Sequence, residues 1–307
     1  MSASGPSKVA AALRGPMVPL VTPYTDELEI DWPGFDGLVE RLLAAGSKVL
    51  LAADLVGEAW ALTIAEKEAL YAATARAAGG RALVVAKLSE PALANAQQLA
   101  RAAGQAGAAA VKVVLPAGVR PRDDEAYDYL TAAVAPAALP FLVETNGEEV
   151  SLAVLRRLAE REDFVGVEET SQDAGRYGTL KELLGPRVAV ICGAEDVLGQ
   201  ALRAGAHGFM TASPNFAPAF MASLWAAAAA RDWERLAELQ ARLGRFRALF
   251  RADLAAGRPA FAPYAKAALA LLGHPVGPPR PPLSPLTASE QAELRAVLAE
   301  ALGLRVA

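Results

Sequence analysis

The chain has 307 residues, 53% of them hydrophobic, and a formal net charge of −4. This length can form one large α/β domain whose core needs no disulfide bonds. The mildly acidic balance and the absence of a basic cluster argue against nucleic acid or an anionic membrane as the main partner. The single cysteine, Cys192, excludes an internal disulfide and a multi-cysteine zinc site, and it fits a reducing, cytoplasmic location. We expect no signal peptide and no membrane span, since the longest strongly apolar stretch (219–230) is too short.

The hydrophobic pattern predicts a repeated unit of apolar strand, polar loop and Ala/Leu-rich helix. Strands are predicted over 16–22, 48–53, 82–87, 109–115, 140–144, 164–168, 188–192 and 208–212. Helices are predicted over 34–45, 63–78, 91–106, 124–134, 151–160, 174–184 and 195–204, with more after 217. Asp31 before Pro33 indicates one helix start, and Thr63 with Glu66 matches a capping box at another.

Eight apolar strands that alternate with helices predict a parallel sheet covered on its outer face, closed as a (β/α)₈ TIM barrel. An open doubly wound sheet is disfavoured because no GxGxxG follows any strand. We expect a flexible N-terminus over 1–14, the barrel over 15–225 and a C-terminal helical extension over 226–307. The Pro-rich segment 273–287 reads as a rigid connector, after which Thr287 and Glu290 cap a last helix.

Active sites of this fold lie at the C-terminal ends of the strands, so polar residues there are the candidates. That edge is rich in carboxylates and has one lysine at a strand end; Asp54, Glu144, Glu168 and Lys87 stand out. Lys112 lies within the predicted fourth strand, and the pattern does not decide whether it points inward or outward.

Several motifs occur in a characteristic order. They are VPLVTPYTDELEID (18–31), VGEAWALTIAEKEAL (56–70), FVGVEETSQD (164–173), GAEDVLGQALRAGAHGFMTASPNFAP (193–218) and RPPLSPLT (280–287). In this order and spacing, the chain resembles the dihydrodipicolinate synthase/N-acetylneuraminate lyase family over about residues 15 to 287. The resemblance implies a homo-oligomer, a tetramer or dimer, and lyase chemistry on 2-keto acids. In that chemistry a lysine at the end of the sixth strand forms an imine, and a tyrosine on the fifth strand relays protons.

The sequence departs from the family pattern at these positions. Glu168 stands where the resemblance places the imine lysine, and Glu144 where it places the tyrosine. Leu55 and Val56 replace a Thr-Thr pair after the second strand, and Glu149 lies near the expected place of an arginine. The loop LPAGVRP (115–121) has small residues where the family carries an aromatic side chain. By resemblance, the substrate-binding positions are Asp54, Leu55, Val56, Glu149, Gly193 and Met210.

A carboxylate cannot form an imine, and added acids repel keto-acid substrates, so Schiff-base chemistry at the usual site is not expected. The acids could perform acid/base chemistry, bind a divalent cation, or receive a cationic or polyhydroxylated small molecule; they could also be vestigial. Lys87 is either a relocated catalytic amine or the charge partner of the acids.

Our leading hypothesis is a lyase-like homologue that binds or converts a small molecule without a metal or cofactor, using Glu168, Glu144 and Lys87. The alternatives are an inactive homologue with a binding or assembly role, and a class I aldolase or dehydratase that uses Lys87.

Overall fold

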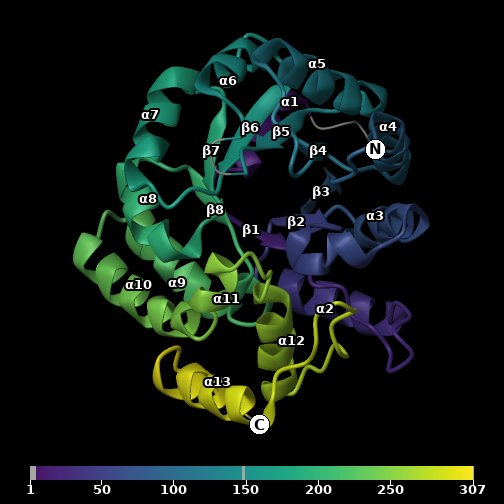
Figure 1. Cartoon of the computed structure of the whole chain (residues 1–307). Helices are drawn as coiled ribbons and strands as arrows, with labels where there is room; N and C mark the ends of the chain where they lie inside the picture. The colour runs from purple at the N-terminus through teal and green to yellow at the C-terminus, as the bar shows by residue number, and fades with distance from the viewer. Residues whose placement is uncertain (1–4, 147–148, 307) are drawn as a thin grey trace.

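The computed structural model describes residues 5–146 and 149–306, and within them eight parallel strands close into a barrel (Figure 1). Each strand pairs with its chain neighbour, and β8 returns to pair with β1. The strands are β1 Pro16–Pro19, β2 Val49–Ala52, β3 Leu83–Leu88, β4 Ala110–Val114, β5 Phe141–Glu144, β6 Phe164–Glu169, β7 Ala189–Cys192 and β8 Gly208–Met210. The predicted (β/α)₈ barrel is therefore confirmed.

Helices surround the barrel and cover the outer face of its strands (Figure 1). They are α2 Trp32–Ala44, α3 Ile64–Ala78, α4 Leu93–Ala106, α5 Asp123–Val134, α6 Leu152–Leu158, α7 Ala174–Leu184, α8 Leu198–Ala204 and α9 Pro218–Ala229. The predicted helix starts are confirmed in detail. The Thr63 hydroxyl accepts a hydrogen bond from the Glu66 amide at 3.2 Å, and the Glu66 carboxylate accepts one from the Thr63 amide at 2.8 Å. The Asp31 carboxylate accepts from the Gly34 amide at 3.0 Å.

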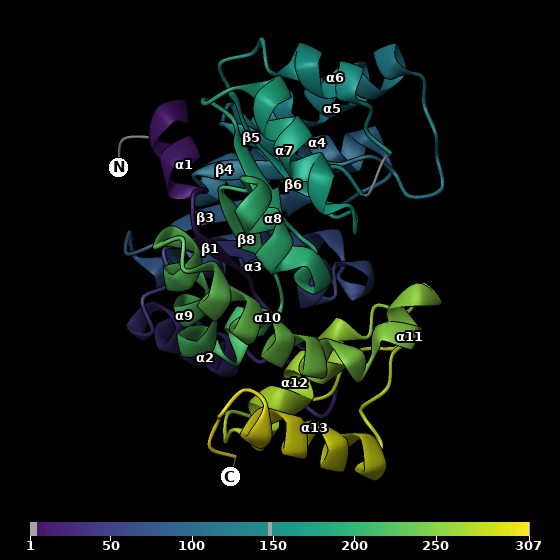
Figure 2. The same cartoon turned by 90° about the vertical axis from the view of Figure 1, so that its left-hand side faces the viewer.

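Of the flexible N-terminus expected over residues 1–14, residues 1–4 lie outside the described part of the chain, and the rest includes a short helix. Pro6–Ala12 form helix α1, which lies across the end of the barrel at the start of the strands (Figure 2). Val9 and Leu13 are buried there among inward-facing strand residues such as Met17 and Val165. Val9 in the helix and Leu13 at its C-cap are apolar, and their burial at the open barrel end holds the segment in place.

The C-terminal extension contains α10 Trp233–Ala248, α11 Arg251–Ala255, α12 Phe261–Leu271 and α13 Ala288–Glu300, and α13 packs on α10 and α12. Within the described residues, no helix is long and apolar enough to cross a membrane.

A buried polar cluster fastens the extension to the loop after β2. The Lys266 ammonium, on α12, lies 2.6 Å from the Glu58 carboxylate, and the Arg280 backbone amide donates to the same carboxylate at 2.7 Å. Both cationic groups lie over the Tyr24 ring, Lys266 at 4.0 Å and Arg280 at 4.3 Å from its centre. Glu58 comes from the VGEAW motif and Arg280 from RPPLSPLT, so two motifs far apart in the sequence meet in one cluster.

Candidate functional site

Charged side chains line the C-terminal end of the barrel interior. On the same strands, the preceding inward-facing residues are apolar. Val85, Ala110 and Leu142 belong to the apolar cluster inside the barrel. Because successive side chains of a strand alternate between faces, the residues two positions later also point inward. Those residues are Lys87, Lys112 and Glu144, and all are buried.

Two neighbouring strands and the loop after β2 complete this polar layer. Glu168 on β6 lies beside Glu144 in the register of the sheet, and Lys112 lies beside Lys87. Asp54 follows β2, after Ala53 turns the chain with a φ of 54°. We call these five residues, Asp54, Lys87, Lys112, Glu144 and Glu168, the mouth network.

Each lysine of the mouth network is shared among carboxylates. The Lys87 ammonium lies 2.6 Å from Asp54 and 2.6 Å from Glu144. The Lys112 ammonium lies 3.0 Å from Asp54, 3.1 Å from Glu144 and 2.5 Å from Glu168. Asp54 and Glu144 therefore contact both amines, while Glu168 joins the network through Lys112.

These contacts keep both amines charged. Burial disfavours an ammonium, but Asp54 and Glu144 outweigh that effect at Lys87 and raise its pKa. At Lys112 the same two acids and Glu168 overcome burial and raise its pKa well above the ordinary value. An ammonium group has no lone pair with which to attack a carbonyl, so the raised pKa of each lysine disfavours a nucleophilic role.

The three acids of the mouth network differ in the direction in which their pKa values are shifted. Burial favours the neutral form of Asp54, yet Lys112 and Lys87 outweigh it and lower the pKa of that carboxyl; the pKa of Glu144 is lowered in the same way. At Glu168 burial dominates, Lys112 opposes it only in part, and the charges of Glu144 and Asp54 add to it. The pKa of Glu168 is raised to about 7. One acid of the network therefore titrates near neutral pH.

Glu169, the residue that follows Glu168 on β6, has a different environment. Glu169 is fully buried on the outer side of β6, where its carboxylate accepts from the Arg176 guanidinium at 2.7 Å and the Ser171 amide at 2.8 Å. The two neighbouring glutamates therefore lie in different surroundings. Glu168 is in the mouth of the barrel, and Glu169 contacts Arg176 in the first turn of α7.

Two cavities border the mouth network. The first, which we call the mouth cavity, encloses about 100 Å³ and is bordered by Lys112, Glu168, Gly193 and Met210, among others. The second, which we call the Trp60 cavity, encloses about 310 Å³; its walls include Trp60 and Lys87. Leu55 and Glu144 line both cavities. The network therefore forms part of a wall that the two cavities share.

Most residues predicted for the site lie at this wall. Asp54, Leu55, Val56, Gly193 and Met210 line the mouth cavity. A side chain at position 193 would collide with Glu168, because a Cβ there would lie 2.7 Å from a Glu168 carboxylate oxygen.

Glu149, predicted to bind substrate, borders neither cavity; its carboxylate accepts a hydrogen bond from the Asn146 side chain at 2.6 Å. Residues 147 and 148 of the same loop lie outside the described part of the chain.

A divalent cation was one of the options for the acids. Among the residues that the structure describes, no group of three or more His, Cys, Asp or Glu side chains could hold a metal ion. Asp54, Glu144 and Glu168 direct oxygens at lysine ammonium groups, which occupy the positions that a bound cation would need.

Sequence reasoning left the direction of Lys112 undecided and missed other residues of the mouth cavity, among them three with charged or aromatic side chains. Lys112 points inward because it lies two positions after Ala110, which the structure places in the apolar cluster inside the barrel. Arg247, Phe261 and Glu195 also line the cavity. The Glu195 carboxylate accepts from the Ser213 amide at 3.0 Å and lies 3.9 Å from the Arg247 guanidinium. Arg247 and Phe261 come from the C-terminal extension, and no local pattern marks them.

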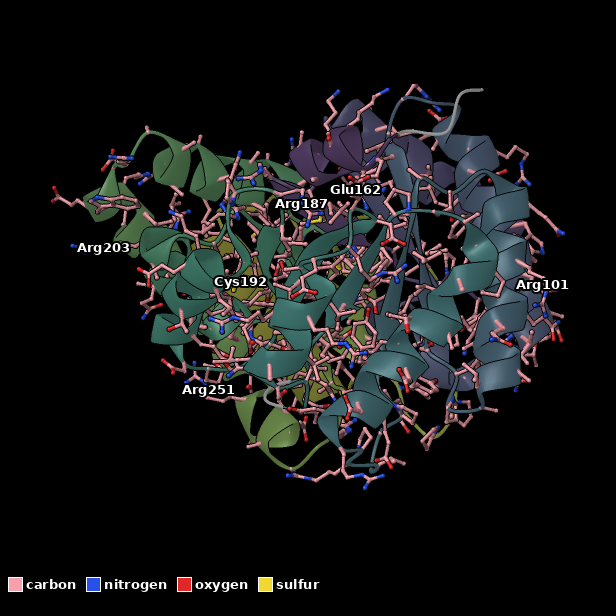
Figure 3. The ribbon with its side chains drawn as sticks, turned by 90° about the horizontal axis from the view of Figure 1, so that it is seen from above. Arg101, Glu162, Arg187, Cys192, Arg203 and Arg251 are labelled. Atoms are coloured by element: carbon pink, nitrogen blue, oxygen red, sulfur yellow. The ribbon has the colours of Figure 1, made fainter. Side chains whose placement is uncertain are left out.

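Cys192 is buried inside the molecule, whereas Arg101 and Arg203 lie at its periphery (Figure 3). Its thiol contacts the Tyr177 hydroxyl and the Ala194 carbonyl, each at 3.3 Å, and burial raises its pKa to about 12. A thiol that stays protonated is a packing group rather than a nucleophile.

Comparisons with known proteins agree with this architecture. The model of the dihydrodipicolinate synthetase family matches residues 12–301. The 4-hydroxy-tetrahydrodipicolinate synthase of Phenylobacterium zucineum is 30% identical over 292 residues, covering 94% of this chain and 97% of that protein.

Two solved structures are also similar. Dihydrodipicolinate synthase from Bacillus clausii superposes with a TM-score of 0.88 at 26% identity, covering 95% of this chain and 98% of that one. The chloride-inhibited enzyme from Acinetobacter baumannii, complexed with pyruvate, gives a TM-score of 0.86 at 25% identity, covering 95% of this chain and 100% of that one.

Proposed function

Because the chain belongs to the dihydrodipicolinate synthetase family but carries Glu168 in the mouth of its barrel, we propose that it acts on a small molecule by proton transfer rather than through an imine. In this proposal the ligand binds in the mouth cavity, and Glu168 donates and accepts the proton. Asp54 and Glu144 stay ionised and hold Lys112, which stabilises negative charge that develops near Glu168.

The position of Glu168, in the wall of the mouth cavity and 2.5 Å from the Lys112 ammonium, is the observation that carries the proposal. A general acid or base is most effective when its pKa lies near the working pH, because both forms are then populated. Glu168 lines the cavity, and its pKa is raised to about 7 by burial and by Glu144 and Asp54.

The charge of the mouth cavity restricts the ligand. Among the described residues, four acids and two basic groups border it: Asp54, Glu144, Glu168, Glu195, Lys112 and Arg247. This excess of acids disfavours an anion such as a keto acid and favours an uncharged or cationic hydroxy compound. The volume of about 100 Å³ limits the part that enters to a few heavy atoms.

Binding of two-carbon probes tests this proposal. Ethanolamine, ethylene glycol and glycolate differ in charge at nearly constant size, and the ¹³C-methyl NMR signal of Met210, which lines the mouth cavity, reports their entry. We expect ethanolamine to bind more tightly as the pH rises from 6 to 8 and Glu168 ionises. Glu168→Gln should remove that dependence. Tighter binding of glycolate than of ethanolamine would contradict the proposal.

Reductive trapping tests the exclusion of imine chemistry. After incubation with pyruvate and borohydride, we expect the intact mass of the protein to stay unchanged, because Lys87 and Lys112 are held as ammonium groups. A pyruvate adduct on either lysine would instead support the relocated class I aldolase.

The second candidate is an inactive homologue with a binding or assembly role. It is favoured by the mutual pairing of all five network residues, which needs no ligand to balance the charges. Failure of all three probes to shift the Met210 signal would support this alternative. A cytoplasmic homo-oligomer remains our prediction for either function.

A further inference from the structure

The mouth network lies behind a nearly closed opening. The side chains of Lys112 and Glu168 are 1% and 6% exposed, and the mouth cavity that they border encloses about 100 Å³. A ligand that contacts Glu168 must therefore displace part of the cavity rim as it enters, because the site otherwise has little contact with solvent. In enzymes with enclosed sites, a loop at the rim commonly provides this movement.

Residues 251–259, which we call the α11 loop, form a part of the rim that has no buried side chain. The residues of α11 itself (Arg251–Ala255) and those that follow are all exposed or half-buried. Arg247 and Phe261, which flank the loop in the sequence, line the mouth cavity. Figure 2 shows α11 projecting on the side of the barrel opposite α1, which is the side of the mouth. A segment without buried side chains loses little packing when it moves.

The two ends of the α11 loop are fixed next to each other. The rings of Phe250, before the loop, and Tyr264, after it, stack with their centres 4.6 Å apart. The Tyr264 hydroxyl also donates to the Leu249 carbonyl at 3.2 Å, and Phe250 and Ala260 are buried. A segment with neighbouring fixed ends and an exposed body has the form of an Ω-loop, which can move as a unit about its ends.

An ion pair ties the α11 loop to the wall of the mouth cavity. The Arg251 guanidinium lies 3.1 Å from the Asp196 carboxylate. Asp196 is in the turn after β7, next to Glu195, which lines the cavity. The ion pair between Asp253 and Arg258, at 2.8 Å, is internal to the loop and would move with it. Arg251 therefore joins the loop to the wall beside the proposed ligand.

We propose that the α11 loop is a lid of the mouth cavity and that the ion pair between Arg251 and Asp196 is its latch. The latch opens readily, because Arg251 is 61% exposed and exposed ion pairs stabilise weakly. Asp196 then keeps Arg247 as its partner at 2.9 Å, so no carboxylate is left unpaired. The lid rests on the function proposed above only in that the ligand enters this cavity; proton transfer by Glu168 plays no part in it.

The rate at which a thiol inside the cavity reacts tests the lid without any ligand. Met210→Cys places a thiol in the cavity wall, and peptide mass spectrometry follows its reaction with methyl methanethiosulfonate. We expect Arg251→Ala to raise this rate about two- to fivefold, the factor by which an exposed ion pair changes an equilibrium. Loss of a positive charge alone would slow the reaction, because it disfavours the thiolate. An unchanged or lower rate would overturn the latch.

Two controls separate lid opening from general loosening of the fold. Arg76→Ala breaks a matched ion pair on the outside of the barrel, in which Arg76 is 62% exposed and lies 3.2 Å from Asp36, and it should leave the rate unchanged. Cys192 is fully buried and reacts only when the chain unfolds, so its rate should be the same in all variants. Acceleration by Arg76→Ala, or of Cys192 by Arg251→Ala, would also overturn the proposal.

Spin labels measure the movement itself. One label at Ala255→Cys on α11 is paired with one at Ala229→Cys, on the exposed end of α9, and a label at Arg101→Cys replaces the first in the control pair. We expect two distances for the α11 pair, with populations that change in Arg251→Ala, and one constant distance for the control pair. A single, unchanged distance for the α11 pair would overturn the lid. Because no ligand is used, a moving lid combined with failure of the ethanolamine test would contradict the proposed function alone, and the reverse result would contradict this inference alone.

Discussion

The carboxyl group of Glu168 gives the folded state a distinctive response to pH. Its pKa is raised from 4.5 to about 7, so the folded state binds this proton more tightly than the unfolded state does. The resulting stability is complete below the unfolded pKa and is lost as the pH rises through the folded pKa. The relevant window therefore runs from about pH 4.5 to 7.

We expect Glu168→Gln to remove this loss. The unfolding free energy of the variant minus that of the parent chain should therefore be about 2 to 3 kcal/mol higher at pH 8 than at pH 5. Urea unfolding at both pH values measures the difference. His207 and His274, whose pKa values are lowered mainly by burial, titrate in both proteins, so the comparison cancels them. Parallel pH profiles for the two proteins would mean that Glu168 stays ionised throughout.

Among the larger elements, the C-terminal extension is joined to the barrel by a buried ion pair as well as by helix packing. Glu58 sits in a left-handed conformation (φ 61°) after the short 3₁₀ turn η1 (Leu55–Gly57), against which α12 packs. Its carboxylate meets Lys266 of α12, and both residues are almost fully buried. Burial lowers the pKa of Lys266 to about 8 even though Glu58 opposes that change. The amine therefore carries a desolvation cost that the carboxylate must offset.

The losses of unfolding free energy from removing each partner of this pair should therefore not add. We expect Glu58→Gln and Lys266→Met each to destabilise the protein by about 3 to 5 kcal/mol, and the double variant to lose clearly less than the sum. Urea unfolding measures the cycle, and proteolysis within residues 273–287 reports release of the extension. The exposed pair Asp36 and Arg76, 3.2 Å apart, is the control and should show a coupling of at most about 1 kcal/mol. Equal coupling in the two pairs would refute the anchoring role of Glu58.

For the molecule as a whole, the barrel was predictable because its signals are local and repeated. Every predicted strand occurs within three residues of its expected bounds, since continuous apolar runs identify strands that are buried on both faces. That same burial hid the direction of Lys112, because a strand with two apolar faces has no polar alternation from which to read it. The identity of Glu168 led to the expectation that no imine forms at its position, while the arrangement of the mouth network could be known only from the folded geometry.

The contributions of distant segments were not predictable. Arg247 and Phe261 reach the mouth cavity from helices that follow the barrel, and their positions depend on packing that no short pattern encodes. At the other end, the short helix α1 buries Val9, and the C-cap residue Leu13 follows it into the same apolar cluster at the barrel opening. The positions of Arg247, Phe261 and helix α1 depend on tertiary contacts, which local helix propensity does not determine.

The N-terminal end of the barrel is closed by apolar side chains and the C-terminal end by charged ones. The stability effects of a substitution at each end should therefore differ in their dependence on pH. Leu13 is fully buried in the apolar cluster that closes the N-terminal end, so Leu13→Ala should destabilise the protein by about 2 to 5 kcal/mol through lost burial and a residual cavity. An apolar truncation changes no titrating group, so this loss should be the same at pH 5 and pH 8, unlike the effect of Glu168→Gln. Urea unfolding at both pH values tests this. A loss that changes with pH would mean that the apolar end and the mouth network are energetically coupled through the barrel interior. Met210 is the residue to examine in that case, because it packs in the apolar cluster and its sulfur lies 3.5 Å from the Lys112 ammonium.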